Sequence, residues 1–176
     1  MIELIILFII AGILVKTADD LADETGEFAL GVVVGAVYGL IFAFLMTESM
    51  VAATVLSGLI LGNMLAKKFD STPHMVALAT IIIAVMFYGN FSTVPWAMGV
   101  FLAAAFADEK LHDAITKGKR TAANKFAAFI GENRLLAEFA GITVAVALWE
   151  PLYFAAVLFT DLGYHMAAFA SKKARE

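Results

Sequence analysis

Long apolar runs alternate with short polar stretches along the whole chain. Each run is bounded by charged residues, glycine, proline or a short polar turn. The runs cover residues 2–18, 28–46, 50–66, 74–88, 95–107, 135–149 and 152–170. A helix needs about 20 apolar residues to cross a bilayer, and fewer when flanking side chains reach back to the surface. The pattern therefore predicts about seven short transmembrane helices.

The composition supports this class. Hydrophobic residues make up 62% of the 176-residue chain, and the mean hydropathy is +0.88, far above that of a soluble domain. The chain has no cysteine, which excludes a disulfide framework and a thiolate metal site. Its net charge of −4 does not favour a nucleic-acid partner. We therefore predict an all-α integral membrane protein, one domain over residues 1–176, that crosses the cell membrane several times.

One stretch, residues 111–133, departs from the apolar pattern. Lysine and arginine alternate there with alanine, phenylalanine and isoleucine. This alternation is typical of an amphipathic helix that lies at the level of the lipid headgroups. We expect such a helix on the membrane surface, between the fifth and sixth crossings.

The basic residues predict the orientation. With alternate crossings, all twelve Lys and Arg residues fall on one side of the membrane. The positive-inside rule makes that side cytoplasmic, with the N-terminus outside and the C-terminus inside. An alternative with six helices joins residues 135–170 across Pro151. It ranks second because it places the three bases near the C-terminus outside.

The first candidate site follows the first apolar run. On a helix, Lys16 lies one turn from Asp19 and Asp20, and Asp19 lies one turn from Asp23. Sites made only of oxygen ligands suit Mg²⁺, Mn²⁺ or Ca²⁺, and we expect Mg²⁺ first. The simpler interpretation is an acidic helix end that pairs with neighbouring lysines.

A second charged cluster follows the fifth run, on the same expected side. Its candidate metal ligands are Asp108, Glu109, His112 and Asp113. Asp108 and His112 lie one helical turn apart, as do Glu109 and Asp113, a spacing that lets two side chains bind one metal. After the third run, Lys67 and Lys68 join Lys16 as candidate phosphate ligands, with a simple cytoplasmic anchor as the alternative for the pair.

The string Asp19-Asp20-Leu21-Ala22-Asp23 resembles the aspartate-rich DDxxD motif of prenyl-diphosphate enzymes. Carboxylates of that motif hold Mg²⁺ on a diphosphate. The likeness covers five residues, the asparagine expected before the motif is Ala18, and Asp108 and Asp113 are five residues apart. The resemblance therefore assigns no family to the chain.

Two further features lie inside the predicted bundle. Asp161 falls well within the seventh run, where an ionisable side chain needs a partner or water, and His165 follows one turn later. Gly31, Gly35 and Gly39 lie four residues apart on one face of the second run, where another helix can approach closely. The glycines predict close helix packing, and we expect a homo-oligomer or a subunit of a membrane assembly.

The main functional hypothesis is a cytoplasmic-side cleft that binds a divalent cation and a phosphorylated membrane lipid. A prenyl lipid and a lipid-modifying transferase are its specific forms, and whether the chain is an enzyme stays open. The alternatives are a cation transporter or channel, and a non-catalytic subunit that packs against other helices. A transporter needs a polar path through Asp161 to the opposite side of the membrane.

Overall fold

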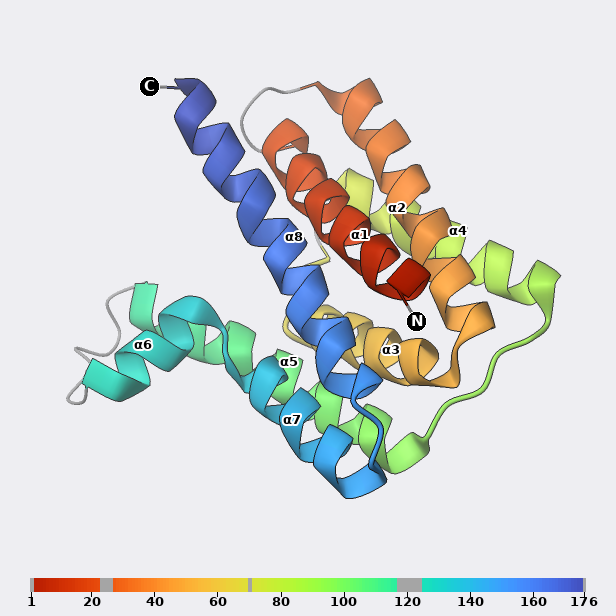
Figure 1. Cartoon of the computed structure of the whole chain (residues 1–176). Helices are drawn as coiled ribbons and strands as arrows, with labels where there is room; N and C mark the ends of the chain where they lie inside the picture. Colours follow the sequence, from red (N-terminus) through yellow and green to blue (C-terminus); the bar gives the residue numbers. More distant parts are fainter. Residues whose placement is uncertain (1, 23–26, 70, 117–124, 176) are drawn as a thin grey trace.

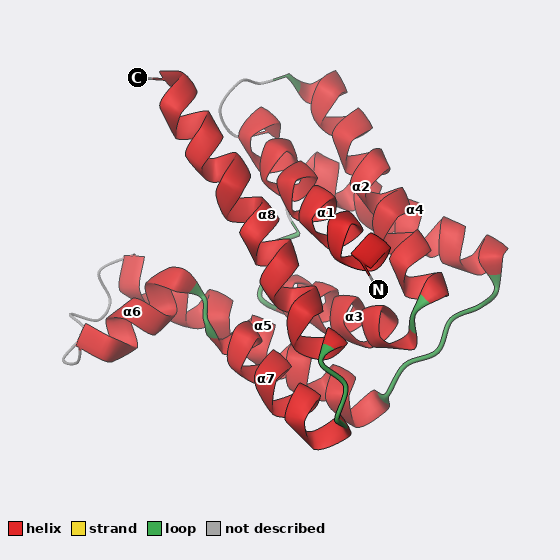
Figure 2. Cartoon of the chain, in the orientation of Figure 1, coloured by secondary structure: helices red, strands yellow, loops and turns green. Residues whose placement is uncertain are grey.

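The structure is a computed structural model that describes residues 2–22, 27–69, 71–116 and 125–175. These residues form eight helices (Figures 1 and 2): α1 (Ile2–Asp20), α2 (Phe28–Glu48), α3 (Met50–Leu65), α4 (Thr72–Tyr88), α5 (Pro95–Thr116), α6 (Lys125–Asn133), α7 (Leu136–Leu148) and α8 (Leu152–Arg175). No strand occurs within the described ranges. The predicted all-α class is confirmed.

The helices begin and end close to the edges of the apolar runs, with two informative exceptions. Helix α5 continues past residue 107, where the apolar run ends, through the second charged cluster to Thr116, so this cluster is helical, as its one-turn spacings require. The surface segment expected at 111–133 is divided between the end of α5 and α6, and residues 117–124 lie outside the described ranges. Helices α7 and α8 are separate, because Trp149 adopts a left-handed backbone conformation with φ of 52° and Pro151 follows.

Three helix pairs pack closely, and glycine lies at each contact. The pairs are α1 with α8, α2 with α4, and α3 with α5. A Cβ atom at Gly39 of α2 would lie 2.7 Å from the carbonyl oxygen of Ala77 in α4, and one at Gly62 of α3 would lie 2.6 Å from that of Leu102 in α5. At Gly12 of α1 it would overlap the Thr160 carbonyl in α8. The glycine face of α2 is therefore occupied within the chain by α4.

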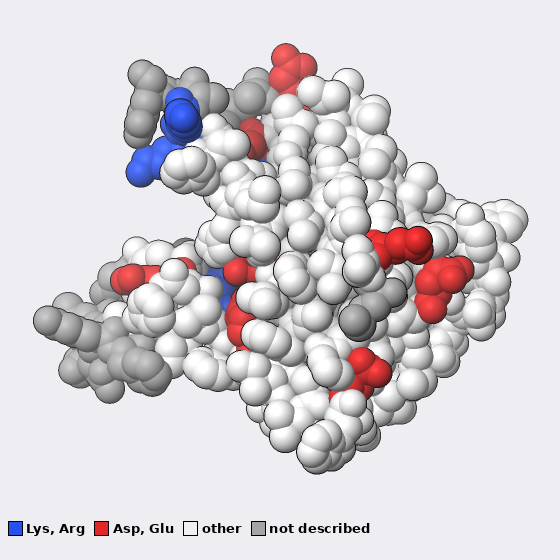
Figure 3. Space-filling view, in the orientation of Figure 1, with Lys and Arg blue, Asp and Glu red and all other residues white. Residues whose placement is uncertain are grey.

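The charged helix ends gather on one side of the molecule. Helices α1, α3, α5 and α8 all end there, whereas the α2–α3, α4–α5 and α7–α8 connections lie on the other side (Figure 1). In the view of Figure 3, Lys and Arg side chains appear where α8 ends and near α6, and acidic side chains also appear on the opposite side.

The outer surface of the bundle is apolar. Helix α2 and residues 152–173 of α8 are long and apolar enough to cross a membrane, and most of each lies on the surface. Helices α3, α4 and α7 are also apolar but shorter, with 16, 17 and 13 residues. Large side chains such as Phe87 and Trp149 are 87% and 92% exposed. Such a surface is typical of a membrane or partner contact.

Candidate functional site

Four side chains from four helices form a hydrogen-bonded chain around Asp19. His74 Nε2 in α4 lies 2.6 Å from Asp19 Oδ1, and the Tyr164 hydroxyl in α8 donates to Asp19 Oδ2 at 3.2 Å. On the other side of the imidazole, the Tyr38 hydroxyl in α2 lies 2.5 Å from His74 Nδ1. We call Asp19, Tyr38, His74 and Tyr164 the Asp19 cluster.

The close helix pairs bring these four residues together. The α2–α4 contact at Gly35 and Gly39 sets Tyr38 beside His74, and the α1–α8 contact sets Tyr164 beside Asp19. Tyr38 is only 3% exposed, whereas the Asp19 side chain retains 26% of its exposure. The cluster therefore begins in the core at Tyr38 and reaches the surface at Asp19.

Lys16 and Asp20 flank the cluster. As predicted from their spacing, they form an ion pair, with Lys16 Nζ 2.6 Å from Asp20 Oδ1. The Ser171 hydroxyl in α8 donates to the other Asp20 oxygen at 2.6 Å. Lys16 also lies over the Tyr164 ring, 5.6 Å from its centroid. The end of α1 thus contacts α8 through Lys16, Asp19 and Asp20.

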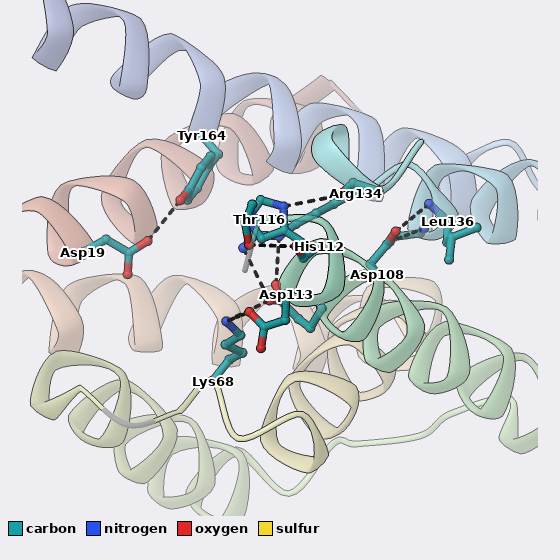
Figure 4. Close-up of polar contacts among 12 residues, drawn as sticks. Asp19, Lys68, Asp108, His112, Asp113, Thr116, Arg134, Leu136 and Tyr164 are labelled. Atoms are coloured by element: carbon teal, nitrogen blue, oxygen red, sulfur yellow. Dashed lines mark hydrogen bonds and ion pairs between the residues drawn. The ribbon is translucent and has the colours of Figure 1, made fainter. Parts of the chain in front are cut away.

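A second set of charged residues joins α5 to the α3–α4 and α6–α7 connections. Lys68 lies 2.9 Å from Asp113 Oδ1 and 3.5 Å from Glu109 Oε2. Arg134 Nε lies 3.0 Å from Glu109 Oε1. The hydrogen bond to Asp113 raises the pKa of Lys68 above its ordinary value. We call Lys68, Glu109, Asp113 and Arg134 the Glu109 network (Figure 4).

Asp108 and His112 contact different partners, although they lie one turn apart. Both Asp108 oxygens accept hydrogen bonds from backbone amides at the start of α7, from Leu136 at 3.0 Å and Ala137 at 2.9 Å. Asp108 is 3% exposed, and this burial raises its pKa, while the two amides act in the opposite direction. His112 Nδ1 lies 3.2 Å from the Gly131 carbonyl oxygen. Asp108 therefore caps α7, a role that the sequence did not suggest.

The two sets of charges face each other across a cleft. Figure 3 shows a notch between the C-terminal half of α8 and α6, with side chains of both signs at its base. Arg134, in the α6–α7 connection, interacts electrostatically with Tyr164 and Asp161 of α8. Asp161 also pairs with His165, as their spacing predicted, at 3.3 Å. We call this notch, with Tyr164 and Asp161 of α8 on one side and Arg134 on the other, the charged cleft.

The predicted site residues are thus divided between two places. Asp19, Asp20 and Lys16 lie together, and Glu109, Asp113 and Lys68 lie together. Asp23 lies outside the described residues, and Lys67 is an exposed residue with a left-handed backbone. Within the described ranges, no group of three or more His, Cys, Asp or Glu side chains lies close enough to hold a metal ion.

Several residues of the site were not found from the sequence. Tyr38, Tyr164 and Arg134 carry no local signal, because each acts on a partner far along the chain. His74 follows Asp70 by four positions in the sequence, but its partner in the structure is Asp19. Asp70 lies outside the described residues.

Comparison with protein-family models, curated proteins and solved structures finds no match to this chain.

Proposed function

We propose that the chain is a multi-pass membrane protein whose charged cleft binds a divalent cation together with a phosphorylated lipid headgroup. The bundle would cross the membrane with α1 to α5, α7 and α8, and the side where the bases gather would be cytoplasmic. The cleft would then open at the level of the lipid headgroups.

The main support comes from the Asp19 carboxylate. Each of its oxygens carries one hydrogen-bond donor, from His74 and from Tyr164, and both donors come from other helices. An ionised carboxylate offers about four acceptor sites, so lone pairs remain on both oxygens. An oriented, partly exposed carboxylate is a suitable ligand for a hard cation.

The small number of carboxylates fits Mg²⁺ or Mn²⁺ better than Ca²⁺. Ca²⁺ takes six to eight oxygen ligands, whereas Mg²⁺ keeps several waters and is commonly held by one or two carboxylates plus phosphate oxygens of a bound molecule. Asp19 would supply the first protein ligand. Asp20 forms an ion pair with Lys16 and accepts a hydrogen bond from Ser171, so it would bind the cation only if the ion pair with Lys16 broke. The lipid phosphate would complete the set.

Two bases are placed to meet that phosphate. Lys16 and Arg134 both interact electrostatically with Tyr164, whose hydroxyl contacts Asp19. A carboxylate and two cationic side chains thus approach the same tyrosine from α1 and from the α6–α7 connection. We assign the phosphate to Lys16 and Arg134 because both interact with Tyr164 beside Asp19, although each also pairs with a carboxylate, Lys16 with Asp20 and Arg134 with Glu109.

The transporter alternative has weaker support. Tyr153 of α8 lies eight residues before Asp161 and about 12 Å away along the helix, and the one polar side chain between them, Thr160, donates its hydroxyl to the Ala156 carbonyl of the same helix. Between Tyr153 and Asp161, Ala156 and Val157 are 1% and 4% exposed. A buried apolar layer of this kind separates the charged cleft from the opposite side and favours a binding site at one surface.

The packing-subunit alternative is favoured by the Glu109 network and by Asp108. Their described contacts join α5 to the α3–α4 connection and to α7 and need no ligand. If the Asp19 cluster has the same role, the protein binds neither an ion nor a phosphorylated lipid. The two functions therefore differ in what the purified protein carries.

Native mass spectrometry with elemental analysis distinguishes a cation and lipid site from a packing role. Wild type should retain a divalent cation and a phosphorylated lipid, Asp19→Asn should lose the cation, and Arg134→Gln should lose mainly the lipid. Glu48→Gln is the matched control, because Glu48 is an exposed carboxylate at the opposite end of the bundle. A wild type that carries neither species, or an Asp19→Asn variant that matches Glu48→Gln, would leave the packing role as the better explanation.

A further inference from the structure

We propose that His74 and Tyr38 are positioning residues that orient the Asp19 carboxylate for the cation. This inference rests on the proposed cation site at Asp19. Neither residue is placed to touch the ligand, since both imidazole nitrogens already have protein partners. Their effect would pass through Asp19.

The hydrogen positions in the chain follow from what each group can donate. An ionised carboxylate only accepts, so the 2.6 Å contact requires a hydrogen on His74 Nε2. A neutral imidazole then has its lone pair on Nδ1, where the Tyr38 hydroxyl donates. Tyr38 is 3% exposed, so its hydroxyl has little contact with water and needs His74 Nδ1 as its hydrogen-bond acceptor.

The other two arrangements fit less well. The opposite tautomer would direct the Nε2 lone pair at the Asp19 oxygen. A doubly protonated imidazole would donate from Nδ1 to the Tyr38 oxygen. The hydrogen of the buried Tyr38 hydroxyl would then lose its acceptor. Tyr38 therefore favours the tautomer with its hydrogen on Nε2, which donates to Asp19 and orients the carboxylate.

Aromatic neighbours hold the imidazole in place. Its centroid lies 5.6 Å from the ring of Phe69 and 6.0 Å from that of Tyr38. Tyr38 in turn packs edge-on against Phe42, with 5.7 Å between centroids. The ring that contacts Asp19 is therefore fixed from two sides, as expected for a residue that orients a ligand.

Two measurements test the inference. In the ¹⁵N spectrum of histidine-labelled protein, His74 should show a protonated Nε2 and an unprotonated Nδ1. In a titration of Mn²⁺ followed by electron paramagnetic resonance, Tyr38→Phe should weaken Mn²⁺ binding about tenfold, the effect typical of losing a group that supports a metal ligand.

The controls separate positioning from general damage to the fold. Tyr153→Phe removes another buried tyrosine hydroxyl, one that bonds Thr54 at the opposite end of the bundle. It should leave the affinity for Mn²⁺ and the His74 spectrum unchanged. His74→Gln, whose amide can still donate to Asp19, should bind Mn²⁺ better than His74→Leu.

The possible results distinguish the inference from the proposed function. If wild type binds no Mn²⁺, the proposed function fails and the positioning role fails with it. If wild type binds Mn²⁺ and Tyr38→Phe binds it equally well, or if His74 carries its proton on Nδ1, the inference alone is overturned.

Discussion

Replacing Gly39 by alanine tests whether the α2–α4 contact holds the Asp19 cluster together. The added Cβ would lie 2.7 Å from the carbonyl oxygen of Ala77, 3.0 Å from its Cα and 3.1 Å from Cβ of Thr80. Two of these three atoms belong to the backbone of α4, which cannot turn aside as the end of a flexible side chain can. The two helices must therefore move apart.

The size of the effect follows from this overlap. The oxygen of Ala77 lies about 0.7 Å inside the 3.4 Å at which ordinary contact begins. Overpacking of this kind typically costs about 1–3 kcal/mol. Alanine in place of glycine regains about 0.5–1 kcal/mol of helix stability. We expect Gly39→Ala to lower the free energy of unfolding by about 1–2 kcal/mol.

Unfolding in mixed detergent micelles measures this loss, with Gly99→Ala as the matched control. Gly99 is also a helical glycine, in α5, but a Cβ there meets nothing within 4 Å. The control should be as stable as wild type or slightly more stable. If Gly39→Ala unfolds at the same denaturant concentration as Gly99→Ala, the close α2–α4 contact is wrong.

Three other predictions concern the charges and the orientation. A single cysteine at Asn90, introduced into this cysteine-free chain, should react with an impermeant reagent only from outside, and one at Lys172 only from inside; the reverse pattern would contradict the orientation. Asp108→Ala should lower the free energy of unfolding by about 1–3 kcal/mol, because two amides at the start of α7 lose their buried acceptor, and Asp108→Asn, which keeps one oxygen, should lose less. In a double-mutant cycle of Lys68→Met with Asp113→Asn, we expect a coupling free energy of only about 0.5–1 kcal/mol, because both side chains are partly exposed, and a value near zero would show that the pair contributes nothing to stability.

The sequence predicted the helices well because apolar runs and their polar boundaries are local signals. It predicted the end of α5 poorly, because Asp108 and Glu109 look like surface residues and are in fact 3% and 8% exposed. Their burial depends on the amides of α7 and on Arg134, which lie more than twenty residues further along the chain. Charge alone does not show which carboxylate has a buried partner.

The candidate site was predicted only in part, because the sequence shows local contacts and not distant ones. Spacing of one helical turn correctly paired Lys16 with Asp20 and Asp161 with His165. It could not find the contact of His74 with Asp19, which spans 55 positions, or that of Tyr164 with Asp19, which spans 145. These contacts depend on the close α2–α4 and α1–α8 packing, and a periodic pattern contains no information about which helices are neighbours.

Thermal unfolding in lipid nanodiscs tests joint binding of a cation and a phosphorylated lipid most directly. The sample would be wild type with or without phosphatidic acid, in Mn²⁺ or in a chelator. At about one hundred times the dissociation constant, a bound ligand contributes about 2.7 kcal/mol, which should raise Tm by about 5 °C or more. We expect this rise only when Mn²⁺ and the phosphorylated lipid are both present, and we expect Asp19→Asn to abolish it. A Tm that does not respond to the combination, or a rise that persists in Asp19→Asn, would contradict the proposed site.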